Sequence, residues 1–179
     1  MIEDMLLIWK FRSGDSAALA KIYEDHRKNL LRIAAGLVNQ ASVAEDIVHD
    51  VFVQLAQSPR RLRLRGNLRS FLTTCVVNRA RDANRAMRQR QTTGMEDAGR
   101  LAADQPEPER WIIDNERLTK LNDALAQLPY EQREVVVLHL QGGLKFRNIA
   151  ASQGVSINTA MSRYRYGLGK LRSLLNGEV

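Results

Sequence analysis

Apolar residues recur every three or four positions along most of the chain, which is the spacing of one face of an α-helix. The strict alternation of apolar and polar residues that indicates a β-strand is absent. We therefore predict an all-α protein. The apolar stripes predict helices over about 3–12, from 16 to the Asn39–Gln40 pair, 42–57, from 68 onward, 111–128, 129–141, 146–153 and from 157 onward.

Turn and cap residues separate these predicted helices. Ser42 and Glu45 have the spacing of a capping box, in which the serine caps the helix and the glutamate lies three residues later. Pro59 ends the helix that follows. Near the end of the chain, Gly154 predicts a sharp turn and Ser156 a helix cap.

An acidic segment divides the chain into two basic parts. Residues 1–91 hold 16 basic and 9 acidic residues, residues 92–110 hold 2 and 5, and residues 111–179 hold 9 and 6. The middle segment also contains two glycines and two prolines and few apolar residues, so it cannot bury enough surface to offset the entropy of ordering. We interpret 1–91 and 111–179 as two small helical domains and 92–110 as a flexible linker. The alternative is an ordered surface loop within one domain.

The composition narrows the class of partner. The chain has 179 residues, of which 44% are hydrophobic and 26% charged, and its net charge is +7. Such an excess favours a polyanionic partner, nucleic acid first and an anionic membrane surface second. The single cysteine, Cys75, excludes an internal disulfide framework and a Cys-based zinc cluster. No apolar run approaches the ~20 residues of a membrane-spanning helix, and we expect an intracellular protein.

Arginine is concentrated between Arg60 and Arg90. This segment contains ten arginines and one acidic residue, Asp82. Arginine contacts to phosphate oxygens position a protein on nucleic acid, so the run predicts a phosphate-binding surface. The alternative is a solvated basic face. Trp9 lies outside this segment, and we expect it to pack in the interior.

The segment from Phe146 to Gly167 has the parts of a helix-turn-helix: a short helix, a turn at Gly154 and a second helix. A plain helical hairpin is the alternative. Tyr164 lies on the inner stripe of the second helix, whereas Gly167 and Gly169 have no explanation in the pattern. The candidates for contacts with base edges are the short polar and basic residues at the front of the second helix, Asn158, Thr159, Ser162, Arg163 and Arg165.

No catalytic or metal-binding constellation accompanies these basic segments. Glu45, His49 and Asp50 have part of the spacing of a helical metal site, but no ligand from another segment is evident. We therefore predict no enzyme activity, no metal and no cofactor.

The two parts together resemble the extracytoplasmic-function (ECF) subfamily of bacterial RNA polymerase sigma factors. The resemblance covers nearly the whole chain and is carried by SVAEDIVHDVFVQL and SFLTTCVVNRARD in the first part. In the second part it is carried by LPYEQREVVVLHLQGGLKFRNIAASQGVSINTAMSRYRYGLGKLRSLL. It implies that 1–91 is sigma region 2 and that 111–179 is sigma region 4, with region 3 replaced by the linker.

The resemblance also implies roles for individual residues. Region 4 would read the −35 promoter element with the helix-turn-helix at about 146–167. Met161 stands where the family often has Lys or Arg, and Phe71 where it often has Trp. The residues implied to read and open the −10 element are Arg65, Gly66, Asn67, Phe71, Asn78 and Arg79. Those implied to dock on RNA polymerase are Asp46, Ile47, His49, Asp50, Phe52 and Val53.

The implied partners are core RNA polymerase, promoter DNA and an anti-sigma factor, in the bacterial cytoplasm. The chain has no dimerisation helix, so we expect a monomer when it is free. A free-standing helix-turn-helix repressor or activator, a nuclease and an RNA-binding protein are the rival interpretations. A nuclease would need carboxylates or a histidine pair beside the basic surface, where only Asp82 lies.

Overall fold

The computed structural model describes residues 2–58, 67–92 and 116–177. Within these ranges the regular elements are helices and no strand occurs, which confirms the predicted all-α class. The helices are α1 (Ile2–Arg12), α2 (Ser16–Val38), α3 (Ala41–Gln57), α4 (Leu68–Thr92), α5 (Glu116–Ala126), α6 (Tyr130–Leu140), α7 (Phe146–Gln153) and α8 (Ile157–Asn176).

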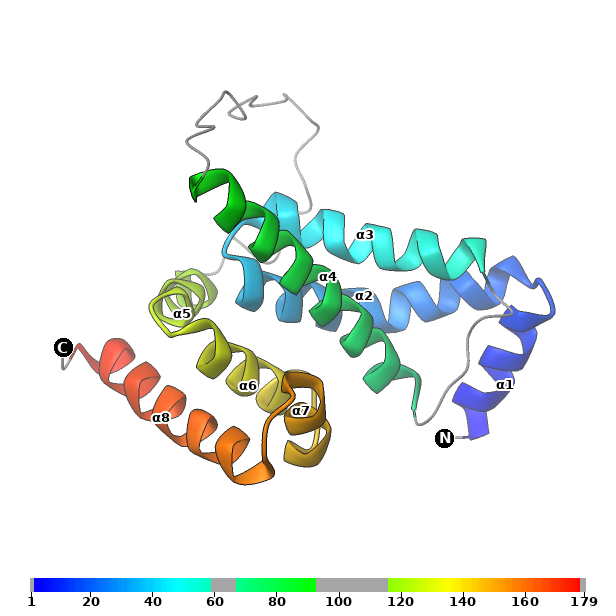
Figure 1. Ribbon diagram of the computed structural model, residues 1–179. Coiled ribbons are helices and arrows are strands. Elements are labelled where there is room, and N and C mark those ends of the chain that lie inside the picture. The colour runs from blue at the N-terminus through cyan, green and yellow to red at the C-terminus, as the bar shows by residue number, and fades with distance from the viewer. Residues whose placement is uncertain (1, 59–66, 93–115, 178–179) are drawn as a thin grey trace.

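Helices α2, α3 and α4 form the first helical body, and α1 lies against the start of α2 (Figure 1). The predicted stripe of α2 faces inward, since Ile22, Leu30 and Ile33 are at most 1% exposed. Leu72 and Val76 of α4 are fully buried against it. Trp9 of α1 is 66% exposed, so the expectation that it packs in the interior is wrong.

The start of α3 differs from the predicted capping box. Asn39 closes α2 in the left-handed conformation, with φ of 56°, and Gln40 then becomes the N-cap of α3 without a side-chain hydrogen bond. The Ala44 amide donates to the Gln40 carbonyl at 3.0 Å, which places Ser42 inside the helix. A two-residue connection between packed helices leaves no room for Ser42 to stay outside α3, so tertiary packing overrides the local cap signal.

Helix α6 is the centre of the second body. Four consecutive residues, Val135 to Leu138, are at most 2% exposed, because α6 is covered by α2 on one side and by α7 and α8 on others. A Cβ at Gly167 of α8 would lie 3.0 Å from Val136 Cγ2 and 3.3 Å from the Gln132 carbonyl oxygen. Gly167 therefore permits α8 to approach α6 closely. Nothing in the structure explains Gly169.

The two bodies share one continuous hydrophobic core. Gly36 of α2 is buried opposite α6, and a Cβ there would lie 3.0 Å from Val137 Cγ2. The predicted linker, 92–110, lies outside the described residues except for Thr92, the last residue of α4. The domain boundaries at 91 and 111 thus remain predictions.

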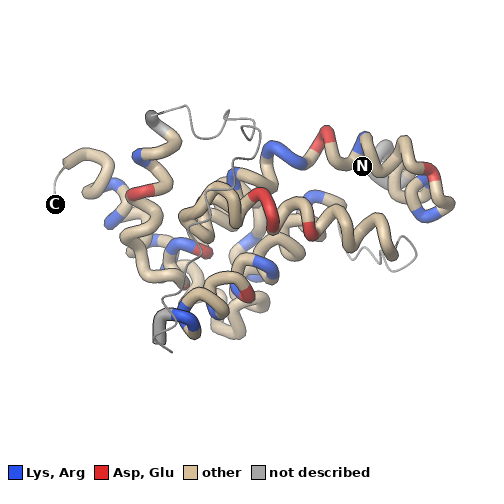
Figure 2. Tube along the Cα trace, turned by 90° about the horizontal axis from the view of Figure 1, so that it is seen from above, with Lys and Arg blue, Asp and Glu red and all other residues tan. Residues whose placement is uncertain are grey.

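No described helix is both long enough and apolar enough to cross a bilayer. Lys and Arg positions occur on helices of both bodies, with Asp and Glu positions interspersed (Figure 2).

Candidate promoter and polymerase surfaces

Helices α7 and α8 form the predicted helix-turn-helix. Gly154 ends α7 with φ of 65°, and its amide donates to the carbonyls of Ala150 and Ala151. Ser156 then caps α8, accepting a hydrogen bond from the Thr159 amide at 3.0 Å. Both features agree with the sequence pattern, because left-handed backbone favours glycine and a serine hydroxyl satisfies a free helix amide.

The exposed face of α8 carries a groove of about 640 Å³. Asn158, Ser162 and Arg165 line it, as expected for residues three or four positions apart on a helix. Met161 also lines the groove and is 48% exposed. Three of the five predicted base-reading residues thus share one surface with an exposed methionine. Met161 was not among the residues predicted to contact bases.

Arg163 lies elsewhere. It is half-buried, and its Nη1 donates to Gln153 Oε1 of α7 at 2.8 Å. Thr159 is exposed at the first turn, where its hydroxyl lies 2.9 Å from Ser156 Oγ. The structure therefore does not bring all five candidates together: Arg163 does not line the groove, because a step of one residue rotates a helix position by about 100°.

Aromatic rings support the groove from below. The His139 ring stacks on Phe146 at 4.2 Å, and Tyr164 meets both rings edge-on. His139 Nδ1 lies 3.0 Å from the Leu144 carbonyl oxygen. Tyr164 packs against the core, as its stripe position predicts.

The start of α4 carries part of the predicted −10 site. Asn67 Oδ1 accepts from the Ser70 amide at 2.7 Å and so caps the helix. Phe71 is half-buried and lines a cavity of about 390 Å³ between the end of α3 and the start of α4. Cys75 lines the same cavity, and burial raises the pKa of its thiol. Arg65 and Gly66 lie outside the described residues.

Asn78 and Arg79 follow on the same helix. Asn78 is exposed, and Arg79 Nη1 lies 3.8 Å from Asp50 Oδ2 of α3. The pair is long and open to solvent, so it contributes little to stability. It does show that the predicted −10 residues and the predicted polymerase-docking residues are neighbours.

The six residues of α3 that are predicted to dock on polymerase differ in exposure. Asp46, His49, Asp50 and Val53 are exposed and form a single stripe at helical spacing, which we call the α3 stripe. Ile47 and Phe52 are only 6% exposed, and Phe52 packs edge-on against Tyr23 at 4.8 Å. The structure thus places these two residues in the core beneath the stripe, and their contact with polymerase stays a prediction.

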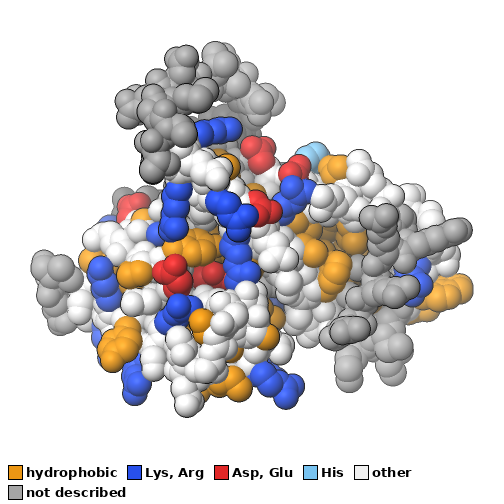
Figure 3. All heavy atoms as spheres, viewed as in Figure 1, with side chains coloured by type: hydrophobic (Ala, Val, Ile, Leu, Met, Phe, Trp, Pro, Cys, Tyr) orange, Lys and Arg blue, Asp and Glu red, His pale blue; other side chains and the backbone are white. Residues whose placement is uncertain are grey.

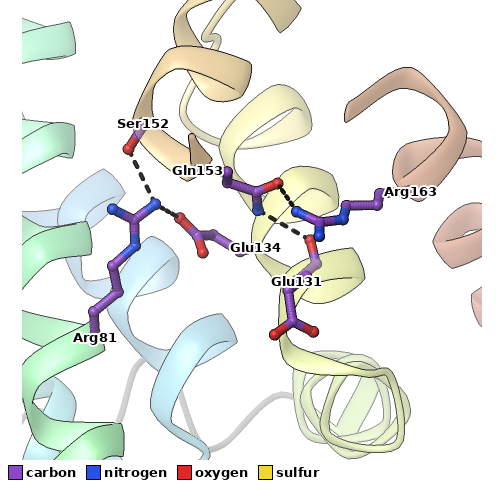
Figure 4. A network of polar contacts seen from close by, with 6 residues as sticks. All are labelled: Arg81, Glu131, Glu134, Ser152, Gln153 and Arg163. Atoms are coloured by element: carbon purple, nitrogen blue, oxygen red, sulfur yellow. Dashed lines mark hydrogen bonds and ion pairs between the residues drawn. The ribbon is translucent and has the colours of Figure 1, made fainter. Parts of the chain in front are cut away.

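Polar contacts that no sequence pattern predicted join α4 and the end of α2 to the second body. We call this region the seam. Arg81 of α4 donates through Nη2 to Glu134 Oε1 of α6 and to Ser152 Oγ of α7, the latter at 3.0 Å (Figure 4). The charged residues of α4 and α6 give no sign of this pairing in the sequence, because the two partners are 53 residues apart.

A second arginine completes the seam. Arg133 of α6 is 9% exposed, and burial lowers its pKa. Its Nη1 donates to the Leu37 carbonyl at 3.3 Å and to Asn39 Oδ1 at 3.2 Å, both at the end of α2. Its Nη2 donates to the carbonyls of Ala126 and Leu128 in the second body, at 3.0 and 3.3 Å.

Known proteins resemble the chain over both bodies. The sigma-70 region 2 family model matches residues 22–91, and the sigma-70 region 4 model matches residues 118–171. The RNA polymerase sigma factor CarQ of Myxococcus xanthus is 32% identical over 171 residues, which cover 95% of each chain. The ECF RNA polymerase sigma factor SigE of Mycolicibacterium smegmatis is 30% identical over 167 residues, covering 91% of this chain and 65% of SigE.

Solved structures share the fold. CnrH, solved in complex with the cytosolic domain of CnrY, superposes with a TM-score of 0.67 at 22% identity, covering 98% of this chain and 99% of CnrH. The sigma factor RpoE of Bartonella quintana, solved with the anti-sigma factor NepR, gives a TM-score of 0.60 at 22% identity, covering 97% and 94%. The two matched family models and the 32% identity to CarQ over 95% of both chains show the family. The chain belongs to the ECF subfamily of RNA polymerase sigma factors.

Proposed function

We propose that this ECF sigma factor recognises promoters through two separate surfaces, the groove of α8 and the start of α4. The observation that carries the proposal is their position on different helical bodies, joined covalently only through the connection from Thr92 to Glu116. Two bodies tethered in this way can contact two DNA elements at once.

The groove of α8 has the chemistry of a major-groove reader. The major groove admits an α-helix, and its base edges present hydrogen-bond acceptors, donors and thymine methyl groups. Asn158 and Arg165 supply amide and guanidinium groups, and Met161 supplies an apolar surface between them. We assign this face to the −35 element.

The start of α4 suits a base extruded from a duplex. A flipped base needs a pocket with a stacking surface, and single-strand binding combines aromatic rings with nearby cations. Phe71 lines such a cavity, and Asn78 and Arg79 follow it on α4. We assign this region to the −10 element, with strand opening driven by binding free energy and by the polymerase.

The α3 stripe is the proposed polymerase contact. It combines two carboxylates, an imidazole and an exposed valine on a rigid helix. The chain's own role is binding rather than bond-making, and we place it in the bacterial cytoplasm, where RNA polymerase acts. Because the structural neighbours CnrH and RpoE were solved with CnrY and NepR, we also propose an anti-sigma partner.

Run-off transcription tests the proposed function. Purified core RNA polymerase, genomic DNA fragments and this chain should yield transcripts that core polymerase alone does not make. Their start sites should share two upstream sequence blocks. If no specific transcript depends on the chain, the proposed function is rejected.

A further inference from the structure

Gly169 is a glycine on the exposed side of α8 that no packing contact explains. A Cβ at this position would meet no heavy atom within 4 Å, whereas a Cβ at Gly167 would approach Val136 and Gln132. Glycine is the poorest helix former after proline, so alanine at an open helix position would favour folding. The fold itself therefore gives no reason for a glycine at this position.

Gly169 belongs to the face of α8 that forms the groove of about 640 Å³. Residues of this face follow one another at steps of three and four positions: Asn158, Ser162, Arg165, Gly169 and Arg172. Arg165 lies one turn before Gly169, and Arg172 lies one turn after it. The open backbone at Gly169 thus continues the surface that carries the proposed base-reading residues.

The same helix has the charge of a surface that binds nucleic acid. α8 contains four basic residues and no acidic one, and basic side chains lie beside hydrophobic ones at the lower left of Figure 3, where α8 is placed. Among the described residues, neither Arg165 nor Arg172 takes part in an ion pair. Their guanidinium groups are therefore available to phosphate oxygens, which they can bind by charge-assisted hydrogen bonds.

α8 is much longer than the major groove of DNA is wide. Its 20 residues span roughly 30 Å at ~1.5 Å per residue, whereas the major groove is about 12 Å wide. Asn158, in the first turn, and Gly169 are separated by roughly 16 Å along the helix axis at the same rise. When α8 lies across the groove with its first turns at the base edges, the helix near Gly169 therefore meets the strand that borders the groove.

We propose that Gly169 is the position at which the sugar–phosphate backbone of the −35 element crosses α8, and that Arg172 binds the phosphate there. The proposal rests on the proposed function for the identity of this DNA element. Without a Cβ, the helix backbone itself forms the surface, so a phosphate group lies closer to α8 at Gly169 than a residue with a side chain would allow. A phosphate held in this way fixes the register of α8 on the duplex and carries no sequence information.

Binding of the full chain to short labelled duplexes tests the proposal. One duplex carries the upstream sequence block that the promoters found by run-off share, and a second carries the same block scrambled. Fluorescence anisotropy at several low salt concentrations gives the affinity and the slope of log K against log[salt] for each duplex. Because the groove of α8 is exposed in the free chain, the measurement does not require polymerase.

Gly169→Leu should weaken binding to both duplexes about tenfold, because the added side chain holds the strand away from α8. The salt slope should fall by about 1, which is the value for one lost phosphate contact. Ala20→Leu is the matched control, since it adds an exposed leucine to α2 of the first body. It should leave the affinity within about twofold of wild type and the salt slope unchanged.

Arg172→Ala should lower the salt slope by the same amount as Gly169→Leu. The double variant should lose little more than either single variant, because both changes remove one shared contact. Additive losses in affinity and slope would show that Gly169 and Arg172 do not act on the same phosphate.

Thermal unfolding separates this role from a structural one. Gly169→Leu should raise Tm while the affinity falls, because leucine favours a helix and meets open space in the free chain. A fall in Tm, an unchanged affinity and salt slope, or a loss confined to the unscrambled duplex would overturn the proposal and leave the proposed function intact. If the wild-type chain with core polymerase directs no specific transcript, the proposed function fails, and the proposal fails with it.

Discussion

Arg163 and Arg165 are two residues apart on one helix, yet their side chains have different environments. Arg165 lines the exposed groove of α8, whereas Arg163 is held by Gln153 beside the seam. Residue type and position in the sequence made them equivalent candidates. Their different rotation about the helix axis accounts for the two environments.

This difference gives a direct prediction for DNA recognition. Arg165→Ala should weaken protection of the −35 element by about 1–3 kcal/mol if Arg165 contacts a base. Arg163→Ala, on the same helix, should leave that protection within about twofold of wild type. Footprinting of the holoenzyme measures both. Equal losses for the two variants would show that the groove is not the reading face.

The pKa of Tyr130 depends on the residues of the seam. Burial, followed by the neighbouring Glu134 carboxylate, raises the pKa of its phenol to about 12. In the unfolded chain the phenol ionises near pH 10, so the unfolded state loses its proton first. The stabilising contribution of Tyr130 is therefore complete below about pH 10 and disappears between about pH 10 and 12.

Absorbance titration at high pH checks this behaviour. The difference between wild type and Tyr130→Phe should isolate one phenol that titrates near pH 12. In Glu134→Gln the same phenol should titrate at lower pH, because the nearby negative charge that raises its pKa is gone. A Tyr130 component near pH 10 in wild type would contradict the buried position.

At the scale of elements, the contact between α6 and α8 depends on a glycine that sequence patterns left unexplained. Gly167 faces Val136 and the backbone of Gln132, whereas a Cβ at Gly169 meets nothing within 4 Å. Both glycines lie inside the same helix, so they share the same cost in helix propensity. Their packing environments differ completely.

The two glycines therefore form a matched pair of variants. Gly167→Ala should lower the free energy of unfolding by about 1–3 kcal/mol, because the added methyl group forces α8 away from α6. Gly169→Ala should raise it by up to about 1 kcal/mol through helix propensity. Urea denaturation followed by circular dichroism measures both. A stabilising Gly167→Ala would contradict the close approach.

The α3 stripe is a second element whose exposed side predicts a function. Asp46→Arg should weaken capture by core polymerase, because it reverses a charge on the proposed docking surface. Asp50→Arg should do the same, and it would also place a cation beside Arg79. Glu24→Arg, exposed on α2, is the control for charge alone. Co-purification with core polymerase checks the prediction, and equal capture of all variants would exclude the stripe.

At the scale of the whole molecule, Arg133 connects the two bodies by donating to backbone carbonyls at the ends of α2 and α5 and to the Leu128 carbonyl just before α6. The last carbonyls of a helix have no partner within the helix, so a buried guanidinium satisfies several of them at once.

Replacing Arg133 should therefore destabilise the closed molecule as a whole. Arg133→Leu should lower the free energy of unfolding by about 2–4 kcal/mol, since it leaves buried carbonyls without donors. Arg147→Leu, exposed on α7, should change it by less than about 0.5 kcal/mol. Chemical denaturation measures both, and a similar small effect from each would show that Arg133 does not join the bodies.

The helices, the helix-turn-helix and the family could be predicted from sequence patterns alone. Periodic stripes such as Ile22 to Ile33 specify a buried helix face, and Gly154 with Ser156 specifies a turn and a cap, because these signals are local and depend on backbone geometry. The motif did not separate the exposed residues of α3 from the buried ones, since it also included Ile47 and Phe52, which are only 6% exposed.

How the two bodies meet could not be predicted from sequence patterns. The pairing of Arg81 with Glu134, the approach of Gly36 to Val137 and the orientation of Arg163 all depend on contacts between residues far apart in the chain. Such contacts produce no periodic pattern in a sequence, because an ion pair requires only that packing brings two opposite charges close together. Local signals therefore identify the family, and long-range contacts determine how the two bodies pack against each other.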